Sequence, residues 1–276
     1  MQGQIIKNVS NDYTVLSENK KFICKARGKF RKLNLIPLVG DYVIFDEKNN
    51  YILEILPRKN SLVRPPVSNI DQIIIVTSVK KPDFDTNLLD KMLTIVEFNN
   101  ITPIICLTKL DLLNESESNE ISEYINYYKK IGYNVVINTE LDKIKELLKG
   151  KINVFTGQSG AGKSTLLNKL DSNLNLKTDE ISKALNRGKH TTRHTELINT
   201  CSCWIADTPG FSALEFIGMT NSDIRDNFIE FNEYKDNCKY KDCMHNLEDV
   251  CEIKNKVNDN TILKSRYENY LKFIRR

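Results

Sequence analysis

Residues 157–164 read Gly157-Gln158-Ser159-Gly160-Ala161-Gly162-Lys163-Ser164 and match the pattern G-x-x-x-x-G-K-[ST] in full. The match lies between an apolar run, 152–155, that predicts a strand and a segment, 165–170, that predicts a helix. In that setting the glycines let the backbone wrap so that its N–H groups point at phosphates, and the helix N-terminus adds a favourable dipole. The pattern assigns Lys163 to the β- and γ-phosphates and Ser164 to Mg²⁺. The stretch therefore predicts a nucleotide site, to which we add the adjoining Thr165.

Two segments further along the chain are expected to sense the γ-phosphate. The sequence Asp207-Thr208-Pro209-Gly210 follows an apolar strand, 203–206, and reads D-x-x-G. In phosphate-switch proteins it supplies an aspartate near Mg²⁺ and a glycine N–H at the γ-phosphate. Upstream, residues 188–194 are polar and charged, as expected for a loop whose threonine binds Mg²⁺ when triphosphate is present. We assign that role to Thr192, with Thr191 as the alternative.

A base-reading motif lies before the phosphate loop. The sequence Thr108-Lys109-Leu110-Asp111 ends the predicted strand 104–107 and reads T-K-x-D. The Asp111 carboxylate can accept hydrogen bonds from the N1–H and the exocyclic amine of guanine, while the Lys109 stem packs on the base. In an ordinary GTPase this motif follows the phosphate loop. The order found here is base reader, phosphate loop, switch loop and D-x-x-G, which indicates a circular permutation.

A cluster of cysteines and one histidine predicts a metal site near the C-terminus. Cys238, Cys243, His245 and Cys251 fall within 14 residues. Three thiolates and an imidazole suit tetrahedral Zn²⁺, and four protein ligands leave no open position for catalysis. We therefore expect one structural Zn²⁺. The other cysteines of the chain fall in apolar runs that predict strands: Cys24, Cys106, Cys201 and Cys203.

The 276-residue chain divides into three predicted domains. Residues 1–63 hold five short β-branched or aromatic runs, which fit an OB-type barrel, with an SH3-like barrel as the nearest competitor. Residues 64–220 alternate predicted strands and helices, which indicates a parallel sheet with helices on its faces. Residues 221–276 turn helical around the cysteine cluster. The expected fold class is α/β, with an N-terminal barrel, a circularly permuted GTPase domain and a C-terminal helical zinc-binding module.

The predicted elements have the following bounds. The barrel strands are expected at 4–9, 13–16, 22–26, 41–45 and 51–56. The α/β domain is expected to have further strands at 71–79, 101–107 and 133–137, helices at 87–98 and 121–131, and the chain a last helix at 261–274.

Composition excludes several classes of protein. Hydrophobic residues make up 40% and charged residues 28%, which is enough apolar material for a packed core. The aliphatic runs are far shorter than the roughly 20 residues of a membrane span, and the opening residues lack a secretory pattern. Seven cysteines without an export signal favour metal binding over disulfides. We therefore expect a cytoplasmic protein with no membrane partner.

Charge is distributed unevenly along the chain. The net charge of +4 is mild, but residues 1–63 hold 11 Lys and Arg against 6 Asp and Glu, while residues 64–231 hold 19 against 22. A basic first domain beside an acidic middle suggests a surface that faces nucleic acid, although a chance lysine bias gives the same count. Five basic residues between the third and fourth predicted strands either clamp phosphates or form a solvated loop: Lys25, Arg27, Lys29, Arg31 and Lys32.

With these motifs in order, the sequence resembles the circularly permuted GTPases of the RsgA type, which act in small ribosomal subunit biogenesis. The resemblance spans nearly the whole chain and includes Pro37-Leu38-Val39-Gly40-Asp41, Arg64-Pro65, Asn69-Ile70-Asp71-Gln72 and Gly188-Lys189-His190-Thr191-Thr192. It implies a zinc site with the spacing found here, GTP and GDP as ligands, and the 30S subunit with its 16S rRNA as partner. We expect the protein to be a monomer.

The chain departs from the family pattern in two places. Its base reader begins with Thr108 instead of the commoner Asn, at a position whose side chain stabilises the loop. In addition, Ile137-Asn138-Thr139 stands where the family usually has a Ser-Ala loop beside the base. Both departures lie beside the expected guanine base, so they bear on the affinity for guanine nucleotides.

The expected reaction is hydrolysis of GTP to GDP and phosphate. It needs an in-line water and neutralisation of charge on the γ-phosphate. Lys163 and a Mg²⁺ held by Ser164 and Thr192 are expected to neutralise the charge on the γ-phosphate. Phe211 follows Gly210 where a Ras-like enzyme has a glutamine, and a phenyl ring cannot orient water. We therefore expect slow intrinsic turnover that the ribosome stimulates, with His190 as the catalytic candidate that the resemblance also suggests and a solvated loop histidine as the alternative.

The predicted function is that of a GTP-gated factor in late maturation of the 30S subunit, in which hydrolysis gates release. Permutation runs the D-x-x-G segment directly into the helical module, which offers a short route for a γ-phosphate-dependent change. Two other functions stay open on sequence alone. The phosphate loop does not choose the base, so an ATP-dependent kinase or ATPase is one of them. The other is a nucleotide-binding RNA scaffold with little turnover, which Phe211 favours.

Overall fold

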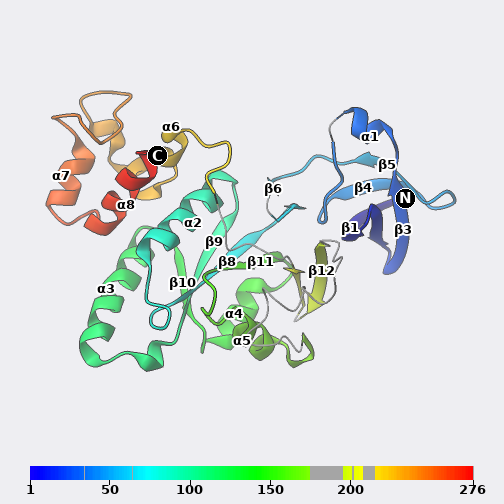
Figure 1. Ribbon diagram of the computed structural model, residues 1–276, viewed down its shortest axis with the longest axis horizontal. Coiled ribbons are helices and arrows are strands. Elements are labelled where there is room, and N and C mark those ends of the chain that lie inside the picture. The colour runs from blue at the N-terminus through cyan, green and yellow to red at the C-terminus, as the bar shows by residue number, and fades with distance from the viewer. Residues whose placement is uncertain (34, 64, 175–194, 201, 208–214, 276) are drawn as a thin grey trace.

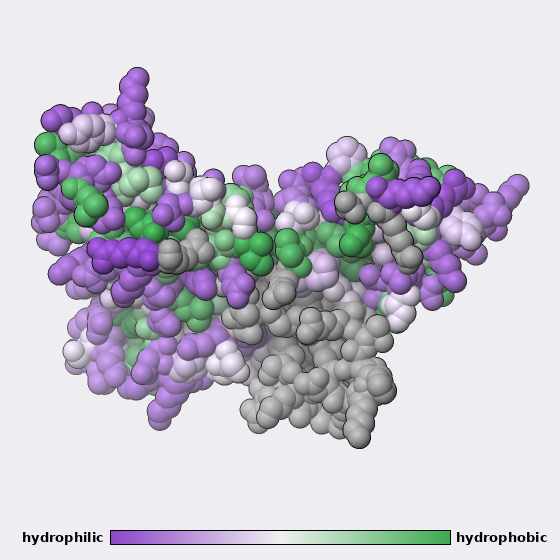
Figure 2. Space-filling view, turned by 45° about the horizontal axis from the view of Figure 1, so that its top comes forward, coloured by the Kyte–Doolittle hydropathy of each residue, from purple (hydrophilic) through white to green (hydrophobic). Residues whose placement is uncertain are grey.

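The computed structural model describes residues 1–33, 35–63, 65–174, 195–200, 202–207 and 215–275. A barrel lies at one end of the molecule, a sheet flanked by helices lies in the centre, and a helical C-terminal part packs on the opposite side (Figure 1). Figure 2 shows hydrophilic residues over most of the described surface, with apolar residues in smaller patches in the middle and at both ends. Within the described ranges, none of the helices is long and apolar enough to cross a membrane.

Five strands close into the predicted OB-type barrel. They are β1 (Gln2–Val9), β2 (Asp12–Ser17), β3 (Lys20–Ala26), β4 (Tyr42–Asp46) and β5 (Tyr51–Ile55). Their order is β1-β2-β3-β5-β4, and β4 pairs back with β1 to close the barrel. Along β4 the side chains alternate: Val43 and Phe45 are buried inside the barrel, whereas Tyr42 is exposed to solvent. The five-stranded barrel is confirmed.

The basic segment after the third strand differs from the predicted loop. Lys25 lies within β3, and residues 29–32 form a short helix, α1 (Lys29–Lys32). The helix forms because Phe30, which is 4% exposed, packs into the barrel and draws one turn of backbone with it. Arg27 and Lys29 therefore flank a turn that is anchored to the barrel by an aromatic side chain.

The central sheet has parallel strands except at one edge. Its order is β10-β9-β8-β11-β13-β12, and all of these pairs are parallel except β12 with β13. The strands are β8 (Gln72–Ser78), β9 (Thr102–Thr108), β10 (Asn134–Ile137), β11 (Ile152–Thr156), β12 (Thr195–Thr200) and β13 (Cys203–Asp207). The helices are α2 (Thr86–Phe98), α3 (Glu115–Lys130), α4 (Leu141–Leu148) and α5 (Lys163–Leu170), and a single 3-10 turn, η2 (Ser172–Leu174), follows α5.

Side chains of the central strands divide between two cores. Ile73 and Ile75 of β8 pack with the core that includes α2 and α3, whereas Ile74 and Val76 pack with α4 and α5 on the other face. A strand with helices on both faces has no solvent side, which explains its unbroken apolar run. The predicted doubly covered, parallel-rich sheet is confirmed.

A polar junction connects the barrel to the central sheet. Asp41 is fully buried and accepts hydrogen bonds from Arg58 Nε at 2.7 Å, Ser68 Oγ at 2.6 Å and the backbone N–H of Leu38 at 2.7 Å. The neighbouring Gly40 has φ 96°, and a Cβ there would lie 2.0 Å from the carbonyl oxygen of Ser68. The junction includes the small hairpin β6 (Ser61–Leu62) and β7 (Val67–Ser68). The motif at 37–41 therefore builds this junction.

The helical C-terminal part packs on the central domain through a buried ion network. Its elements are α6 (Asn221–Asp226), η4 (Ile229–Glu233), η5 (Lys235–Asn237), α7 (Glu252–Asn258) and α8 (Lys264–Ile274). Arg266 of α8 is 0% exposed and donates to Asp90 of α2 at 2.8 Å and to both oxygens of Glu230 at 2.7 and 2.8 Å. Asp90 also accepts from Tyr128 at 2.6 Å and from Asn269 at 2.7 Å. These contacts fix the C-terminal part against α2.

Several helix bounds differ from the sequence prediction, and some whole elements were not predicted. Helix α3 begins at Glu115 instead of 121, because Asn114 and Glu117 form a capping box with two 2.9 Å hydrogen bonds. The last helix begins at Lys264 instead of 261, because Asp259 accepts from the backbone of Thr261 at 2.9 Å and holds a turn there. The short helix α4 and the antiparallel strand β12 were not predicted.

Candidate nucleotide site and metal cluster

The phosphate-loop sequence forms a turn between β11 and α5 at the carboxyl edge of the sheet. Gly157 has φ 138°, and a Cβ there would lie 1.9 Å from the carbonyl oxygen of Val76. Gly162, at φ 94°, begins the helix in the left-handed region. Lys163 Nζ donates to the carbonyls of Gly157 at 2.7 Å and Gln158 at 3.0 Å, and burial lowers its pKa. The loop is therefore preformed around its own lysine, with Ser164 buried in the first helical turn.

The base-reading motif contacts the phosphate loop directly. Thr108 is 1% exposed, and its hydroxyl donates to the carbonyl of Ala161 at 2.6 Å. Lys109 has φ 64°, and its Nζ donates to the carbonyl of Gly160 at 2.8 Å. Asp111 lies in the turn η1 (Leu110–Leu112) with its carboxylate exposed. Thr108 therefore links the base reader to the phosphate loop through its hydroxyl. The family usually has an Asn at this position.

The loop after β8 forms a third wall of this site, which the sequence analysis missed. The carbonyl of Lys81 accepts a short hydrogen bond from Lys109 Nζ, and Lys80 Nζ contacts both carboxylate oxygens of Glu117 at 2.7 Å. Pro82 lies against Gly160 of the phosphate loop. On the other side of the base reader, the N–H of Asn138 donates to the carbonyl of Leu107 at 2.9 Å, so 137–139 adjoins the motif.

The remaining predicted nucleotide residues fall at or beyond the limits of the described chain. Asp207 ends β13, and its backbone lies at the same edge as the phosphate loop because Ala206 is registered opposite Val154 of the parallel neighbour β11. Thr165 is exposed on α5. The other predicted residues lie outside the described residues: Thr208, Pro209, Gly210, Phe211, His190, Thr191 and Thr192.

The predicted cysteine and histidine ligands converge in the C-terminal part. The ligand atoms of Cys238, Cys243, His245 and Cys251 all lie within 4.8 Å of one another. Nδ1 of His245 is 3.6 Å from the sulfur of Cys238 and 3.4 Å from that of Cys251, and these two sulfurs are 4.0 Å apart. A tetrahedral site with Zn–S bonds of about 2.3 Å has sulfurs about 3.8 Å apart, so the spacing fits such a metal.

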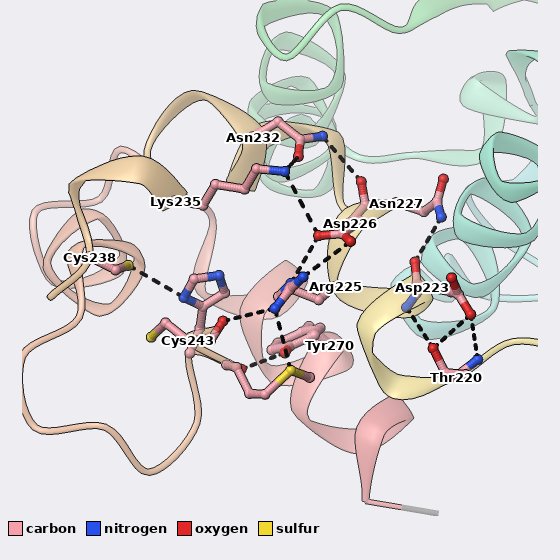
Figure 3. Close-up of polar contacts among 12 residues, drawn as sticks. Thr220, Asp223, Arg225, Asp226, Asn227, Asn232, Lys235, Cys238, Cys243 and Tyr270 are labelled. Atoms are coloured by element: carbon pink, nitrogen blue, oxygen red, sulfur yellow. Dashed lines mark hydrogen bonds and ion pairs between the residues drawn. The ribbon is translucent and has the colours of Figure 1, made fainter. Parts of the chain in front are cut away.

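Hydrogen bonds from neighbouring helices hold the loop that carries the ligands. Figure 3 shows Arg225 of α6 between Asp226 and the loop, where its Nη1 is 3.4 Å from the carbonyl of Cys243. Glu248 accepts from two loop N–H groups at 2.6 and 2.8 Å, and Tyr267 of α8 donates to the carbonyl of His245 at 2.7 Å. The geometry of the cluster is therefore set by side chains of both α6 and α8.

The protonation states of the cluster also suit a cation. Burial, with Arg225 nearby, lowers the pKa of His245 to about 4, so its imidazole is neutral at pH 7 and able to coordinate. Burial and the neighbouring thiols raise the pKa of Cys243 to about 12. Three thiolates this close repel one another unless a metal ion lies among them. The cluster can therefore hold a metal ion in its chemistry as well as in its spacing.

A phosphate loop and a T-K-x-D motif that meet at the carboxyl edge of a parallel sheet, with the base reader first in the chain, define a circularly permuted P-loop GTPase. Family comparison matches residues 55–217 to the RsgA GTPase and residues 2–52 to the RsgA N-terminal domain. The chain belongs to the RsgA family of GTPases. The predicted family is confirmed, and the ATP-dependent alternative is set aside.

Individual relatives resemble the chain over its full length. A protein named small ribosomal subunit biogenesis GTPase RsgA 2, from Listeria monocytogenes, is 49% identical over 280 residues, covering 99% of this chain and 96% of the relative. The crystal structure of YloQ, a circularly permuted GTPase, superimposes with TM-score 0.82 at 38% identity, covering 99% and 93% of the two chains. YjeQ from Thermotoga maritima superimposes with TM-score 0.85 at 34% identity, covering 99% and 96%.

Proposed function

We propose that this GTPase binds the 30S ribosomal subunit, acts in its late maturation, and hydrolyses GTP to GDP and phosphate faster on the ribosome than alone, with hydrolysis gating release. The observation that carries the proposal is the direct contact of the guanine motif with the phosphate loop through Thr108 and Lys109. The base-reading motif and the phosphate loop are thereby joined into one binding site for the base and the phosphates of GTP. The name and the 49% identity of the Listeria relative support the small subunit as the partner.

In this proposal the base reader and phosphate loop divide the nucleotide between them. Asp111 accepts hydrogen bonds from guanine, Lys109 packs its stem on the base, and Thr108 keeps the two motifs in register. The backbone N–H groups of residues 157–165 surround the phosphates. Lys163 already lies in the loop, held by two carbonyls, so little reorganisation is needed when a phosphate replaces those partners.

Hydrolysis is assigned to residues on three segments. Lys163 neutralises charge that develops on the γ-phosphate, and Asp207 and Gly210 flank it from the D-x-x-G sequence. Ser164 and Thr192 would hold Mg²⁺, which supplies charge neutralisation when bound. We assign orientation of the attacking water to His190, because Phe211 cannot do so. The proposal predicts slow turnover without the ribosome.

We assign a structural role to the metal cluster and the contact with rRNA to the barrel. We assign one structural Zn²⁺ to Cys238, Cys243, His245 and Cys251, since four ligands leave no open coordination position. We assign 16S rRNA contacts to the basic turn of the barrel, where Arg27 and Lys29 lie. We further propose domains at 1–63, 64–220 and 221–276, a monomeric state, and action in the cytoplasm.

The first test is GTP hydrolysis by the purified protein, alone and with purified 30S subunits, with ATP as the control nucleotide. We expect GTP-selective turnover that rises on addition of 30S subunits. Tight GTP binding with no stimulation would favour the RNA scaffold with little turnover, which Phe211 made an alternative. Equal turnover of ATP would contradict the guanine assignment.

A sharper test of the guanine assignment is Asp111→Asn. An amide cannot accept from both the N1–H and the amine of guanine, so GTP affinity should fall at least about 100-fold, since each hydrogen bond to a charged group contributes ~1.5–3 kcal/mol. Xanthosine triphosphate presents an oxygen where guanine has its amine, so its affinity should rise. Competition of both nucleotides for a fluorescent GDP analogue measures this. Asp142→Asn on α4 is the matched control, and equal GTP affinity in both variants would refute the role of Asp111.

A further inference from the structure

The barrel and the central sheet form one continuous sheet through the pairing of β1 with β12. The pairing is antiparallel, with Lys7 registered opposite Glu196 and Asn8 opposite Thr195. Strand β12 pairs on its other side with β13, where Glu196 is registered opposite Asp207. A single row of residues therefore crosses three strands, from Lys7 in the barrel through Glu196 to the first residue of the D-x-x-G sequence.

This row is anchored firmly on the barrel side. The N–H of Ile5 donates to the carbonyl of Asp41 at 2.8 Å, and the N–H of Gly40 donates to the carbonyl of Ile5 at 2.8 Å. Asp41 belongs to the buried junction with Arg58 and Ser68. Any displacement of the barrel therefore moves β1 with it.

The connection from β1 to β12 is narrow by comparison. It has two registered pairs and one ion pair, in which Lys7 Nζ is 2.6 Å from Glu196 and the side chains are 35% and 33% exposed. The side-chain oxygen of Asn8 is buried there without a hydrogen-bond partner among the described residues. An unpaired buried oxygen weakens the pairing around it. The Lys7–Glu196 contact is therefore the specific link in this row.

The row also lies next to both segments that sense the γ-phosphate. Thr195, the first residue of β12, directly follows the polar sequence 188–194. At its far side the row reaches Asp207, the first residue of D-x-x-G.

We propose that Lys7 is a positioning residue for the ribosome-stimulated part of GTP hydrolysis. Its ion pair with Glu196 connects the barrel to the row that ends at Asp207, so that contact of the barrel with RNA raises turnover through this row. The proposal rests on the proposed function, in which the barrel contacts rRNA. Lys7 touches neither nucleotide nor metal in this scheme. Its effect is on the position of β12 and β13, the second of which carries the backbone of Asp207.

The test compares kcat and KM for GTP, with and without saturating 30S subunits, in Lys7→Ala, Glu196→Gln and the exchanged pair Lys7→Glu with Glu196→Lys. Both single variants should keep basal kcat and 30S binding in sedimentation within about twofold. Their stimulated kcat should fall about three- to fivefold, the range that a partly exposed ion pair supports. The exchanged pair and Lys7→Arg should recover most of the stimulation. Lys20→Ala, at the far end of β3, is the matched control.

The outcomes separate this inference from the proposed function. If the wild type is stimulated and both single variants are stimulated equally, the inference is wrong and the proposed function stands. If stimulation is lost because Lys7→Ala no longer sediments with 30S subunits, Lys7 is an RNA contact and the inference is again wrong. A wild type that 30S subunits do not stimulate overturns the proposed function itself.

Discussion

The C-terminal part and the β1 edge of the barrel contact the central domain in opposite ways. The C-terminal part is held by Arg266, fully buried between Asp90 of α2 and Glu230. The barrel is held to the edge strand β12 by two registered pairs and the one-third exposed pair of Lys7 and Glu196. Because water is excluded around Arg266, its ion pairs are strong and the loss of one partner is costly. Solvent screens the Lys7–Glu196 ion pair and weakens it. The C-terminal part is therefore expected to move with α2. The β1–β12 edge is the weaker of the barrel's two connections, since the buried junction of Asp41, Arg58 and Ser68 also holds the barrel to the sheet.

This difference adds a second route of communication to the expected one. The sequence places the D-x-x-G segment directly before the C-terminal part, which suggested that a γ-phosphate-dependent change passes straight into it. The ion network also fixes that part to α2, and α2 follows the loop of Lys80 and Lys81 that contacts the base reader. The C-terminal part is therefore tied to the base side of the nucleotide site as well as to the D-x-x-G side.

Breaking the buried network should give the largest effect on stability. Arg266→Met leaves Asp90 and Glu230 buried without their cation, and burial already raises the pKa of Asp90. We expect the free energy of unfolding to fall by about 3–5 kcal/mol, measured by urea denaturation. Lys264→Ala, two residues earlier and exposed, should change it by less than about 0.5 kcal/mol. If the folded yield of Arg266→Met is too low, Arg266→Lys should give an intermediate loss. Equal stability of Arg266→Met and wild type would refute the strong attachment.

Removing the metal should give the next largest effect, confined to the C-terminal part. Chelation removes the metal, and Cys251→Ser removes one of its ligands. The loop that carries the ligands is tied to α8 through Tyr267. At a free metal concentration of 100 to 1,000 times the dissociation constant, the loss is about 3–4 kcal/mol. Hydrogen exchange should rise in residues 238–251, while the barrel strands keep their protection. Cys24→Ser, in a barrel strand, controls for loss of a thiol, and a metal content of one per chain in that variant checks the stoichiometry.

Breaking the barrel pair should have the smallest effect on stability. Lys7→Ala removes a partly exposed ion pair, so the free energy of unfolding should fall by only about 0.2–1 kcal/mol. The loss should shrink further at high salt, because solvent ions screen the pair. Thermal unfolding at two salt concentrations measures both. A loss as large as that of Arg266→Met would remove the contrast between the two attachments.

The prediction from sequence was most successful where chemistry is local. The phosphate loop, the base reader and the cysteine cluster are short patterns, and their residues lie where strand and helix patterns predicted them. Helix α3 was predicted six residues short, although Asn114 and Glu117 carry the capping-box spacing that signals its start. Strand β12 was missed because its alternation of apolar and polar residues is weak and its partner β1 lies far from it in the chain.

By itself, the sequence determined the order of the nucleotide motifs, the residues of the cysteine and histidine cluster and the alternation of strands and helices, because each depends on residues within a few positions of one another. Only the tertiary structure decided how the three parts are attached. Arg266 and Asp90 are 176 residues apart, and Lys7 and Glu196 are 189 apart. Their pairing follows from which helix packs on which face and which strand lies at the sheet edge, and no local pattern carries that information.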